Sequence, residues 1–181
     1  QYSIKSADTN LKYGAGSYRL WTASVYVYNE FKKNGWILGT GLRSSLYNNT
    51  DRSVFTLEPR INLTKFLGRA DKLMLAYDRT SQPTHSIYET NYNMQSDFWV
   101  PFKEKNVPTA DQLSLGWKNF ALTNWELSIE AYYRKMKNLI RINNLENYLD
   151  AGIDYSKGTG DAYGMEFMVQ YNKNRFSGWF S

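Results

Sequence analysis

The sequence predicts an all-β fold: an antiparallel, up-and-down transmembrane β-barrel with short periplasmic turns and long extracellular loops. The first observation is a period of two, clearest in Trp125–Arg134, where apolar or aromatic residues alternate with carboxylates, a hydroxyl, a phenol and a guanidinium. Side chains alternate between the faces of a strand, so this segment has one apolar and one polar face. The second observation is the asymmetry between short and longer connections, and the third is the aromatic residues that flank the short ones.

The composition limits the classes of protein that fit. The 181 residues include 17% aromatic residues and 15 tyrosines, but no apolar run near the roughly 20 residues that a spanning helix needs. Any membrane crossing must therefore be made by strands. The absence of cysteine excludes disulfides and thiolate metal sites within the chain. The net charge of +5 is scattered along the sequence, whereas a nucleic-acid binder more often has a clustered basic stripe, so we expect no nucleic-acid partner.

Four strands are expected in the first half of the chain. Asn34 and Gly35 form an Asn-Gly pair, a strong hairpin signal, between the first two strands. Pro59 lies within the third strand and cannot donate to a ladder, so we expect a bulge or a local break there. These strands are expected at residues 17–31, 36–45, 55–64 and 72–78, with connections at 32–35, 48–53 and 67–71.

The second half contains two long segments without a sustained period. Residues 81–111 and 142–160 are expected to be long loops, and loops of such length in a compact domain are usually functional or disordered. His85, the only histidine, falls in the first of them and is expected to be a solvated loop residue. Strands are expected at residues 113–118, 125–134, 163–171 and from 176, with short turns at 120–124 and 172–175; the sequence ends within the eighth strand.

The sequence pattern leaves open which face of the strands meets water and which meets lipid or a protein core. In a soluble sandwich or lipocalin-like barrel the apolar face turns inward, whereas in an outer-membrane barrel lipid takes it and a wet lumen takes the charges. The short turns would share one rim with a girdle of aromatic rings, and recurrent carboxylates and guanidiniums would be costly toward lipid. We therefore expect these residues to face a lumen: Glu58, Arg60, Glu126, Glu130, Arg134 and Glu166.

Several stretches together resemble a known family. The segment 104–141 contains VPTADQLSLGWKN and WELSIEAYYRKMKNLI, residues 158–181 read GTGDAYGMEFMVQYNKNRFSGWFS, and GTGLRSSLY, LEPRINLT and LAYDRTSQPTH stand upstream in the same order. This set resembles the barrel half of TonB-dependent outer-membrane receptors of the kind common in Bacteroidetes. The resemblance implies a 22-stranded barrel with an amino-terminal plug, driven by TonB. Residues 1–181 contain no plug, no TonB box and about eight strands, and are expected to be part of the barrel domain.

No catalytic constellation is predicted. Glu126 and Glu130 are four residues apart on one strand, roughly 13 Å by strand rise, which is too far for a glycosidase acid and nucleophile. Gly158 and Gly160 are not followed by the helix and lysine of a phosphate-binding loop. We expect neither an enzyme nor a metal or cofactor site. Exposed rings on a long loop suit stacking on sugars or planar ligands, so the candidate ligand-binding residues are Tyr88, Tyr92, Phe98 and Trp99.

The expected function is active transport in the outer membrane of a Gram-negative bacterium. The receptor would import a scarce extracellular nutrient, such as a sugar, peptide, siderophore or haem. The expected partners are outer-membrane lipid and lipopolysaccharide, and TonB through a region outside this chain. Two alternatives stay open: a self-contained eight-stranded anchor or adhesin barrel, which eight strands can close, and a soluble lipocalin-like barrel with its apolar faces around a small ligand.

Overall fold

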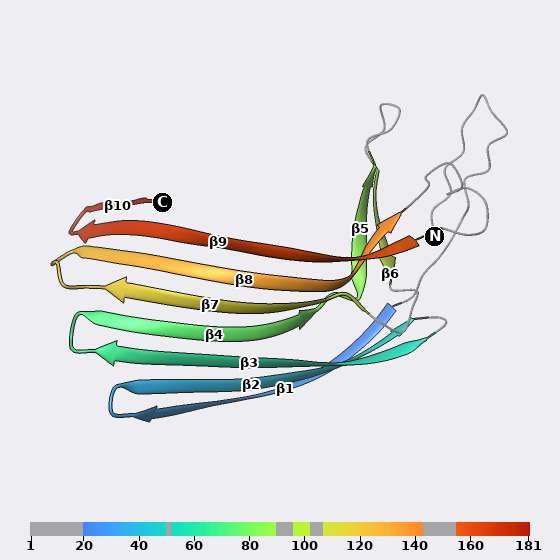
Figure 1. The fold of residues 1–181 in the computed structure, drawn as a ribbon, viewed down its shortest axis with the longest axis horizontal. Helices are drawn as coiled ribbons and strands as arrows, with labels where there is room; N and C mark the ends of the chain where they lie inside the picture. The colour runs from blue at the N-terminus through green and yellow to red at the C-terminus, as the bar shows by residue number, and fades with distance from the viewer. Residues whose placement is uncertain (1–19, 50–51, 90–95, 102–106, 143–154) are drawn as a thin grey trace.

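The chain forms one large antiparallel sheet and one small hairpin (Figure 1). The computed structural model describes residues 20–49, 52–89, 96–101, 107–142 and 155–181. Every element in these residues is a strand, and none of them forms a helix able to cross a membrane. The large sheet has eight strands in the order β1-β2-β3-β4-β7-β8-β9-β10, and β5 pairs only with β6. The expected all-β, up-and-down antiparallel architecture is confirmed.

The strands are longer than the sequence pattern predicts. Most of them extend beyond the alternating residues used for the prediction, because backbone hydrogen bonds pair strands whether the side chains are polar or apolar. The strands are β1 Leu20–Lys33, β2 Trp36–Asn49, β3 Ser53–Leu67, β4 Asp71–Ser81, β5 Thr84–Glu89, β6 Ser96–Pro101, β7 Thr109–Asn119, β8 Trp125–Ile142, β9 Tyr155–Lys173 and β10 Phe176–Phe180.

The four short turns are where the sequence predicts them, and all lie at one end of the sheet (Figure 1). Asn34 and Gly35 have φ of 50° and 74°, and Lys33 pairs with Trp36, so the first hairpin has a two-residue turn with both residues left-handed. Gly68, at φ 77°, opens the turn between β3 and β4. In an antiparallel sheet alternate connections lie at the same end, so the order of short and longer connections along the chain places all four short turns on one rim.

Three expectations about the connections are wrong. Residues 81–111 are not one loop: Ser81 ends β4, β5 and β6 form a hairpin, and β7 begins at Thr109. His85 accordingly lies on β5, opposite Val100. Residues 142–160 are not all loop either, because β9 begins at Tyr155. These segments lack a period of two in sequence, so their pairing was not visible locally.

Pro59 produces no bulge. The β2–β3 ladder passes through Leu42 and Pro59 without a shift in register. Pairing between β3 and β4, however, stops at Arg60, the next residue. Pro59, which has no N–H to donate, therefore lies one residue beyond the end of that ladder. The irregularity is elsewhere, on β8, where the register shifts between Met136 and Leu139 and Asn138 has φ 56°.

Each short turn is displaced along the sheet from the one before. Lys65 is opposite Trp36, yet β3 continues two residues further to Leu67, which pairs with Asp71. Leu127 is opposite Asn119, and β8 begins two residues earlier at Trp125. A stagger of two residues, roughly 6.6 Å, over two strand spacings of roughly 4.8 Å gives a strand tilt of about 35°. Such a regular stagger is what the wall of a barrel requires.

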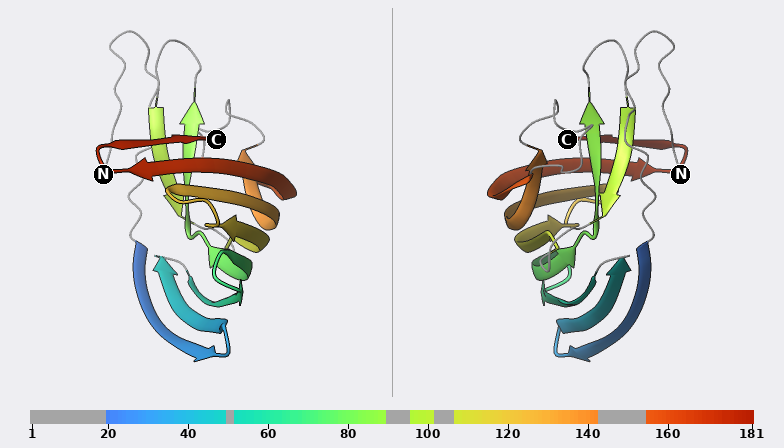
Figure 2. Two further views of the ribbon diagram at one scale, coloured as in Figure 1. Left: turned by 90° about the vertical axis from the view of Figure 1, so that its left-hand side faces the viewer. Right: turned by 90° about the vertical axis from the view of Figure 1, so that its right-hand side faces the viewer.

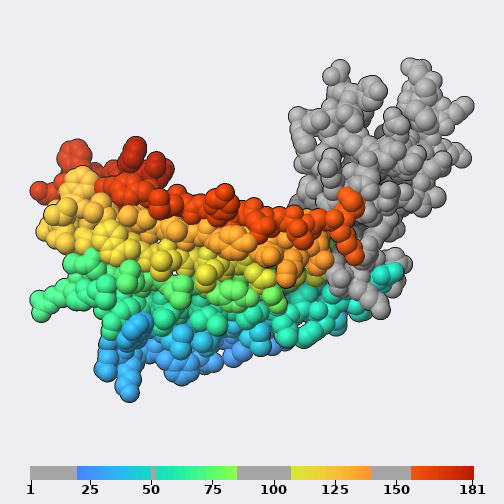
Figure 3. Space-filling view, in the orientation of Figure 1, coloured from blue at the N-terminus to red at the C-terminus, as the bar shows by residue number. Residues whose placement is uncertain are grey.

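The sheet is curved but open. End-on views show its strands as an arc with β1 and β10 at the two edges (Figure 2). Within the described residues these edges are not paired with each other, so the eight strands do not form the closed barrel of the first alternative. In the space-filling view the strands lie against one another as one continuous wall (Figure 3).

The apolar side chains do not form a sealed centre. Among the described residues the buried hydrophobic cluster consists of Tyr47, Val54 and Val107 only, with Leu20 packed against it. The leucines and tryptophans of the strands are exposed instead: Trp21, Leu57, Leu115 and Trp125 retain 56%, 49%, 58% and 44% of their accessible surface. A lipocalin-like arrangement would bury these residues, so the soluble alternative does not fit this sheet.

Candidate functional site

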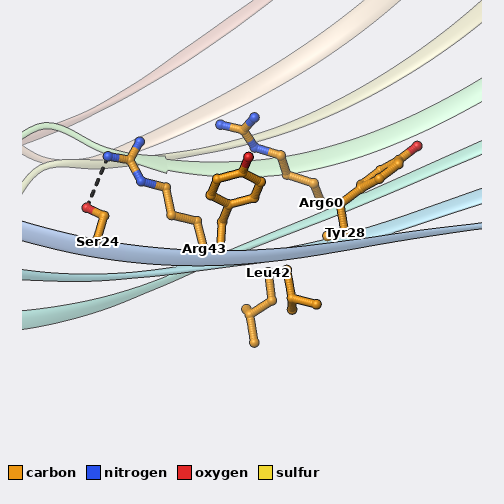
Figure 4. Close-up of a pocket in the computed structure, with 8 residues that line it drawn as sticks. Ser24, Tyr28, Leu42, Arg43 and Arg60 are labelled. Atoms are coloured by element: carbon orange, nitrogen blue, oxygen red, sulfur yellow. Dashed lines mark hydrogen bonds between the residues drawn. The ribbon is translucent and has the colours of Figure 1, made fainter.

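The two faces of the sheet are chemically opposite. Cross-strand partners carry their side chains on the same face, so the register assigns each residue to a face. In Figure 4, Arg43, Arg60 and Tyr28 point to the side where the later strands curve over, and Leu42 points away. We call the first side the concave face and the second the convex face. The concave face is the candidate functional site.

All six residues predicted to face a lumen share the concave face. Arg43 is opposite Glu58 on β3, which places Glu58 and then Arg60, two residues further, on this face. The register carries the same face across β4 and β7 to β8 and β9, where Glu130 pairs with Glu166. Glu126 and Arg134 are separated from Glu130 by even numbers of residues on β8 and so lie on the same side.

Glu58 is the most deeply placed charge of this face. It keeps 2% of its accessible surface, and the hydroxyl of Tyr47 donates to its Oε1 at 3.3 Å. Arg43 Nη1 lies 4.0 Å from Glu58 Oε2, and Arg43 Nη2 donates to Ser24 Oγ at 3.2 Å. A buried carboxylate is costly unless it is paired and hydrogen-bonded, so this network is what permits Glu58 at that depth.

Two other predicted residues have definite partners. Lys118 Nζ on β7 contacts Glu126 Oε1 on β8 at 2.6 Å, with about a quarter of each side chain exposed. Arg134 Nε donates to Gln112 Oε1 at 2.8 Å across the same pair of strands. Both contacts join β7 to β8 and stabilise the sheet. Glu126 and Arg134 therefore each use part of their hydrogen-bonding capacity within the sheet and have less left for a ligand.

Glu130 and Glu166 form a different arrangement. They are direct cross-strand partners on β8 and β9, and both are exposed. Within the described part of the chain no hydrogen bond or ion pair is found for either carboxylate. Like charges directly opposite each other are destabilising, so the pair is retained only where water solvates both groups. The same residues do not make a metal site: no group of three or more possible ligands occurs in the described ranges.

A hollow on β1–β3 brings together residues that the sequence did not single out. It encloses about 520 Å³ and its lining includes Ser24, Tyr26, Tyr28, Gly41, Arg43 and the predicted Arg60. The volume falls in the range of small-molecule sites. The period of two in the sequence places these residues on the polar face, but the residues predicted to face a lumen were mainly carboxylates. Only the register between β2 and β3 shows that Arg43 and Arg60 are diagonal neighbours.

The predicted ligand-binding aromatics belong to the small hairpin. Tyr88 lies on β5 opposite Asp97, and Phe98 and Trp99 lie on β6 opposite Ile87 and Ser86. Tyr92 lies outside the described residues. The hairpin is attached where Gln82 N donates to Pro108 O at 3.0 Å, next to Val107, whose carbonyl accepts from Asn138 Nδ2 at 3.2 Å. Asn138, at the bulge of β8, therefore contacts the residue that leads into β7.

The convex face is apolar and ringed by aromatic residues near the short-turn rim. Lys65 Nζ lies 4.6 Å from the centroid of the Trp36 ring, and the rings of Trp125 and Tyr171 are in contact, with centroids 4.8 Å apart and planes tilted by 50°. Phe66 is also near this rim, but it pairs with Lys72 and therefore lies on the concave face. The large exposed apolar residues of the convex face, among those described, are Trp21, Val25, Val27, Phe31, Trp36, Leu42, Leu46, Phe55, Leu57, Ile61, Leu67, Leu73, Leu75, Leu113, Leu115, Trp125, Ile129, Tyr133, Tyr163, Met165, Phe167, Phe176 and Phe180.

Comparison with known proteins identifies the fold. No protein-family model and no curated protein sequence matches the chain. Among solved structures, it superposes on the siderophore receptor PirA from Pseudomonas aeruginosa with a TM-score of 0.62 and 16% identity, over 86% of this chain and 32% of that one. It also superposes on the FrpB iron transporter from Neisseria meningitidis with a TM-score of 0.61 and 9% identity, over 90% of this chain and 25% of that one.

The chain shares its fold with a part of each of these two proteins: an antiparallel, up-and-down sheet of the kind that forms the wall of a barrel. The chain spans about a third or less of the length of these two proteins, and identity at this level shows the fold alone. In such a barrel the convex face is the outer surface and the concave face is the inner wall.

Proposed function

We propose that this chain is part of the barrel of an outer-membrane receptor that imports a scarce nutrient in a TonB-dependent manner. The observation that carries the proposal is the inverted distribution of side chains: the apolar face is convex and exposed, and the charged face is concave and contains the buried Glu58. Hydrocarbon tails are the solvent that such a convex surface requires. The tilt of about 35° and the likeness to a siderophore receptor and an iron transporter support the same conclusion.

In this proposal the protein resides in the outer membrane of a Gram-negative bacterium. The convex face contacts lipid and lipopolysaccharide, and Glu58, Arg60, Glu126, Glu130, Arg134 and Glu166 line the lumen. The plug and TonB box belong to regions outside this chain, and the protein acts as a transporter and not as an enzyme. The stretches quoted above favour a receptor of the Bacteroidetes type with a 22-stranded barrel.

Adjacent positions on β1 provide a test of the lipid assignment. Val27 and Tyr28 are similarly exposed, at 56% and 50%, but lie on the convex and concave faces. These 181 residues contain no cysteine, so in the whole protein, with any cysteine elsewhere replaced by serine, Val27→Cys and Tyr28→Cys each provide one site for an environment-sensitive fluorophore. We expect nitroxide-labelled lipid to quench the label at position 27 and not at 28. Equal quenching, or quenching at 28 alone, contradicts the membrane arrangement.

Transport itself is tested in cells. A strain that lacks the receptor should lose uptake of its nutrient, and a strain with an intact receptor but no TonB should lose it to the same extent. Both solved neighbours are named for iron or a siderophore, so a ferric siderophore is the first nutrient to test, followed by haem, peptides and sugars. Uptake that persists without TonB would overturn the energy coupling, whatever the nutrient.

The aromatic hairpin residues stay proposed ligand contacts. Tyr88, Phe98 and Trp99 lie on strands that leave the large sheet at the long-connection rim (Figure 1). Replacing each of these residues, and Tyr92, by alanine should weaken nutrient binding by roughly 1–3 kcal/mol where a ring stacks on the ligand. An unchanged dissociation constant for all four variants would remove the hairpin from the binding site.

A further inference from the structure

We propose that the hollow on β1–β3 is a binding subsite for a planar anion, such as an aryl carboxylate, with Arg60 and Arg43 as the charge partners and Tyr28 as the stacking surface. The inference rests on the proposed transport function, because it assigns a ligand chemistry to one part of the inner wall. Its evidence lies in the contacts of three residues.

Arg60 is the charge that has no partner of its own. It is exposed, and among the described residues no hydrogen bond or ion pair is found for its guanidinium. Its cross-strand partner on β4 is Asp78, but the two side chains form no ion pair and Asp78 does not line the hollow. A planar guanidinium with its donors unused matches a carboxylate geometrically, since it can make two parallel charge-assisted hydrogen bonds.

Arg43 is the second guanidinium and is already oriented. Arg60 is opposite Gly41, and Arg43 lies two residues further on β2, so the two arginines are diagonal neighbours, roughly 7–8 Å apart at their Cα atoms. The hydrogen bond to Ser24, drawn in Figure 4, and the contact with Glu58 hold Arg43 on the concave side. Because Glu58 compensates the charge of Arg43, the net positive charge of the hollow belongs to Arg60.

Tyr28 provides a flat surface beside these charges. A Cβ atom at Gly41 would lie 3.4 Å from Cδ2 of the Tyr28 ring, and one at Gly39 would collide with the phenol. The ring therefore lies over the backbone of these two glycines, where a side chain at position 39 would displace the phenol, and 50% of the surface of Tyr28 remains exposed. An exposed ring held flat beside a guanidinium is suited to stack on another planar group while the cation binds its charge.

Equilibrium binding to the whole purified receptor tests the subsite independently of transport. Benzoate and benzamide have nearly the same shape and differ in charge, and inorganic phosphate is an anion without a plane. We expect benzoate to bind more tightly than benzamide by isothermal titration calorimetry. Arg60→Gln should weaken benzoate binding about tenfold and leave benzamide unchanged, since it removes a charge-assisted contact. Tyr28→Leu should weaken benzoate but not phosphate.

Arg134→Gln is the matched control. It removes a guanidinium from the same concave face, outside the hollow, and should leave benzoate binding unchanged. If Arg60→Gln lowers the melting temperature of the receptor and wild-type protein binds none of the three probes, Arg60 holds another part of the receptor and the proposal is wrong. Equal loss in Arg60→Gln and Arg134→Gln contradicts it as well. The outcome is separable from the proposed function, because uptake and TonB dependence are measured in cells without these probes.

Discussion

Arg79 on β4 binds Asp111 on β7 through two parallel contacts, with Nε 2.7 Å from Oδ1 and Nη2 3.0 Å from Oδ2. The pair lies on the convex face, one row beyond Tyr77 and Leu113. Tyr77 also donates to Asp111 Oδ1 at 2.8 Å. At the other end of the same strands, Asp71 accepts from Asn119 Nδ2 at 2.7 Å. These two polar rows bound the apolar rows between them, and in the proposed barrel they mark the edges of the lipid-facing band.

The first prediction concerns the boundary formed by Arg79 and Asp111. Asp111→Asn should lower the free energy of unfolding by roughly 1 kcal/mol, because the fork with Arg79 is lost and the pair is only partly exposed to solvent. Asp161→Asn is the control, since Asp161 lies in the same row but contacts the single hydroxyl of Tyr133. Urea unfolding followed by heat-modifiable gel migration measures both. A larger loss of unfolding free energy for Asp161→Asn than for Asp111→Asn would contradict a structural role for the two-contact ion pair between Arg79 and Asp111.

The second prediction concerns charge on the two faces. Leu115 is 58% exposed on the convex face, four residues from the rim end of β7, whereas its neighbour Ser114 faces the concave side. Leu115→Lys should destabilise the folded protein in bilayers by about 2–4 kcal/mol, the cost of a lysine near the middle of the membrane. Ser114→Lys should cost much less, because the lumen is wet. Similar losses for the two variants, measured by unfolding in lipid vesicles, would show that both faces meet the same solvent.

The third prediction concerns the buried carboxylate. Tyr47 keeps 2% of its surface, and its hydroxyl is a donor to Glu58. Tyr47→Phe should lower the free energy of unfolding by about 1–3 kcal/mol, because it leaves a buried charge with one donor fewer. Tyr28→Phe removes a phenol from a half-exposed ring and should change stability little. The comparison fails to support the network if both variants unfold at the same denaturant concentration as the parent.

The fourth prediction concerns the first hairpin. Gly35 has φ 74°, a conformation that costs an alanine about 1 kcal/mol or more. Gly35→Ala should therefore lower stability by that amount and slow refolding into lipid vesicles. At Gly158 on β9 an added Cβ would meet no atom within 4 Å, and φ there is not positive, so Gly158→Ala should be neutral or slightly stabilising. Stability of Gly35→Ala equal to that of the parent would argue against the left-handed turn.

The sequence determined the strands with a regular period of two, the turns that join them and the division into faces. Alternation from Trp125 to Arg134 is a local property, and so is the Asn-Gly pair at 34 and 35, because both depend only on neighbouring residues. Glu58 and Glu130 each lie on the side of their own strand opposite its apolar residues, so the same local rule places both on the polar face. The long connection at 81–111, in contrast, has no period, so the β5–β6 hairpin within it could not be predicted.

The tertiary structure alone decided how the rows align between strands. β5 and β6 separate β4 from β7 in the sequence, so no local signal specifies the register between β4 and β7. That alignment places Asp111 against Arg79, and the β2–β3 register places Arg60 beside Arg43 with no partner for its charge among the described residues. The reason is physical: a strand's own sequence fixes which face each side chain occupies, but the neighbour that it meets is set by hydrogen bonding to a different part of the chain.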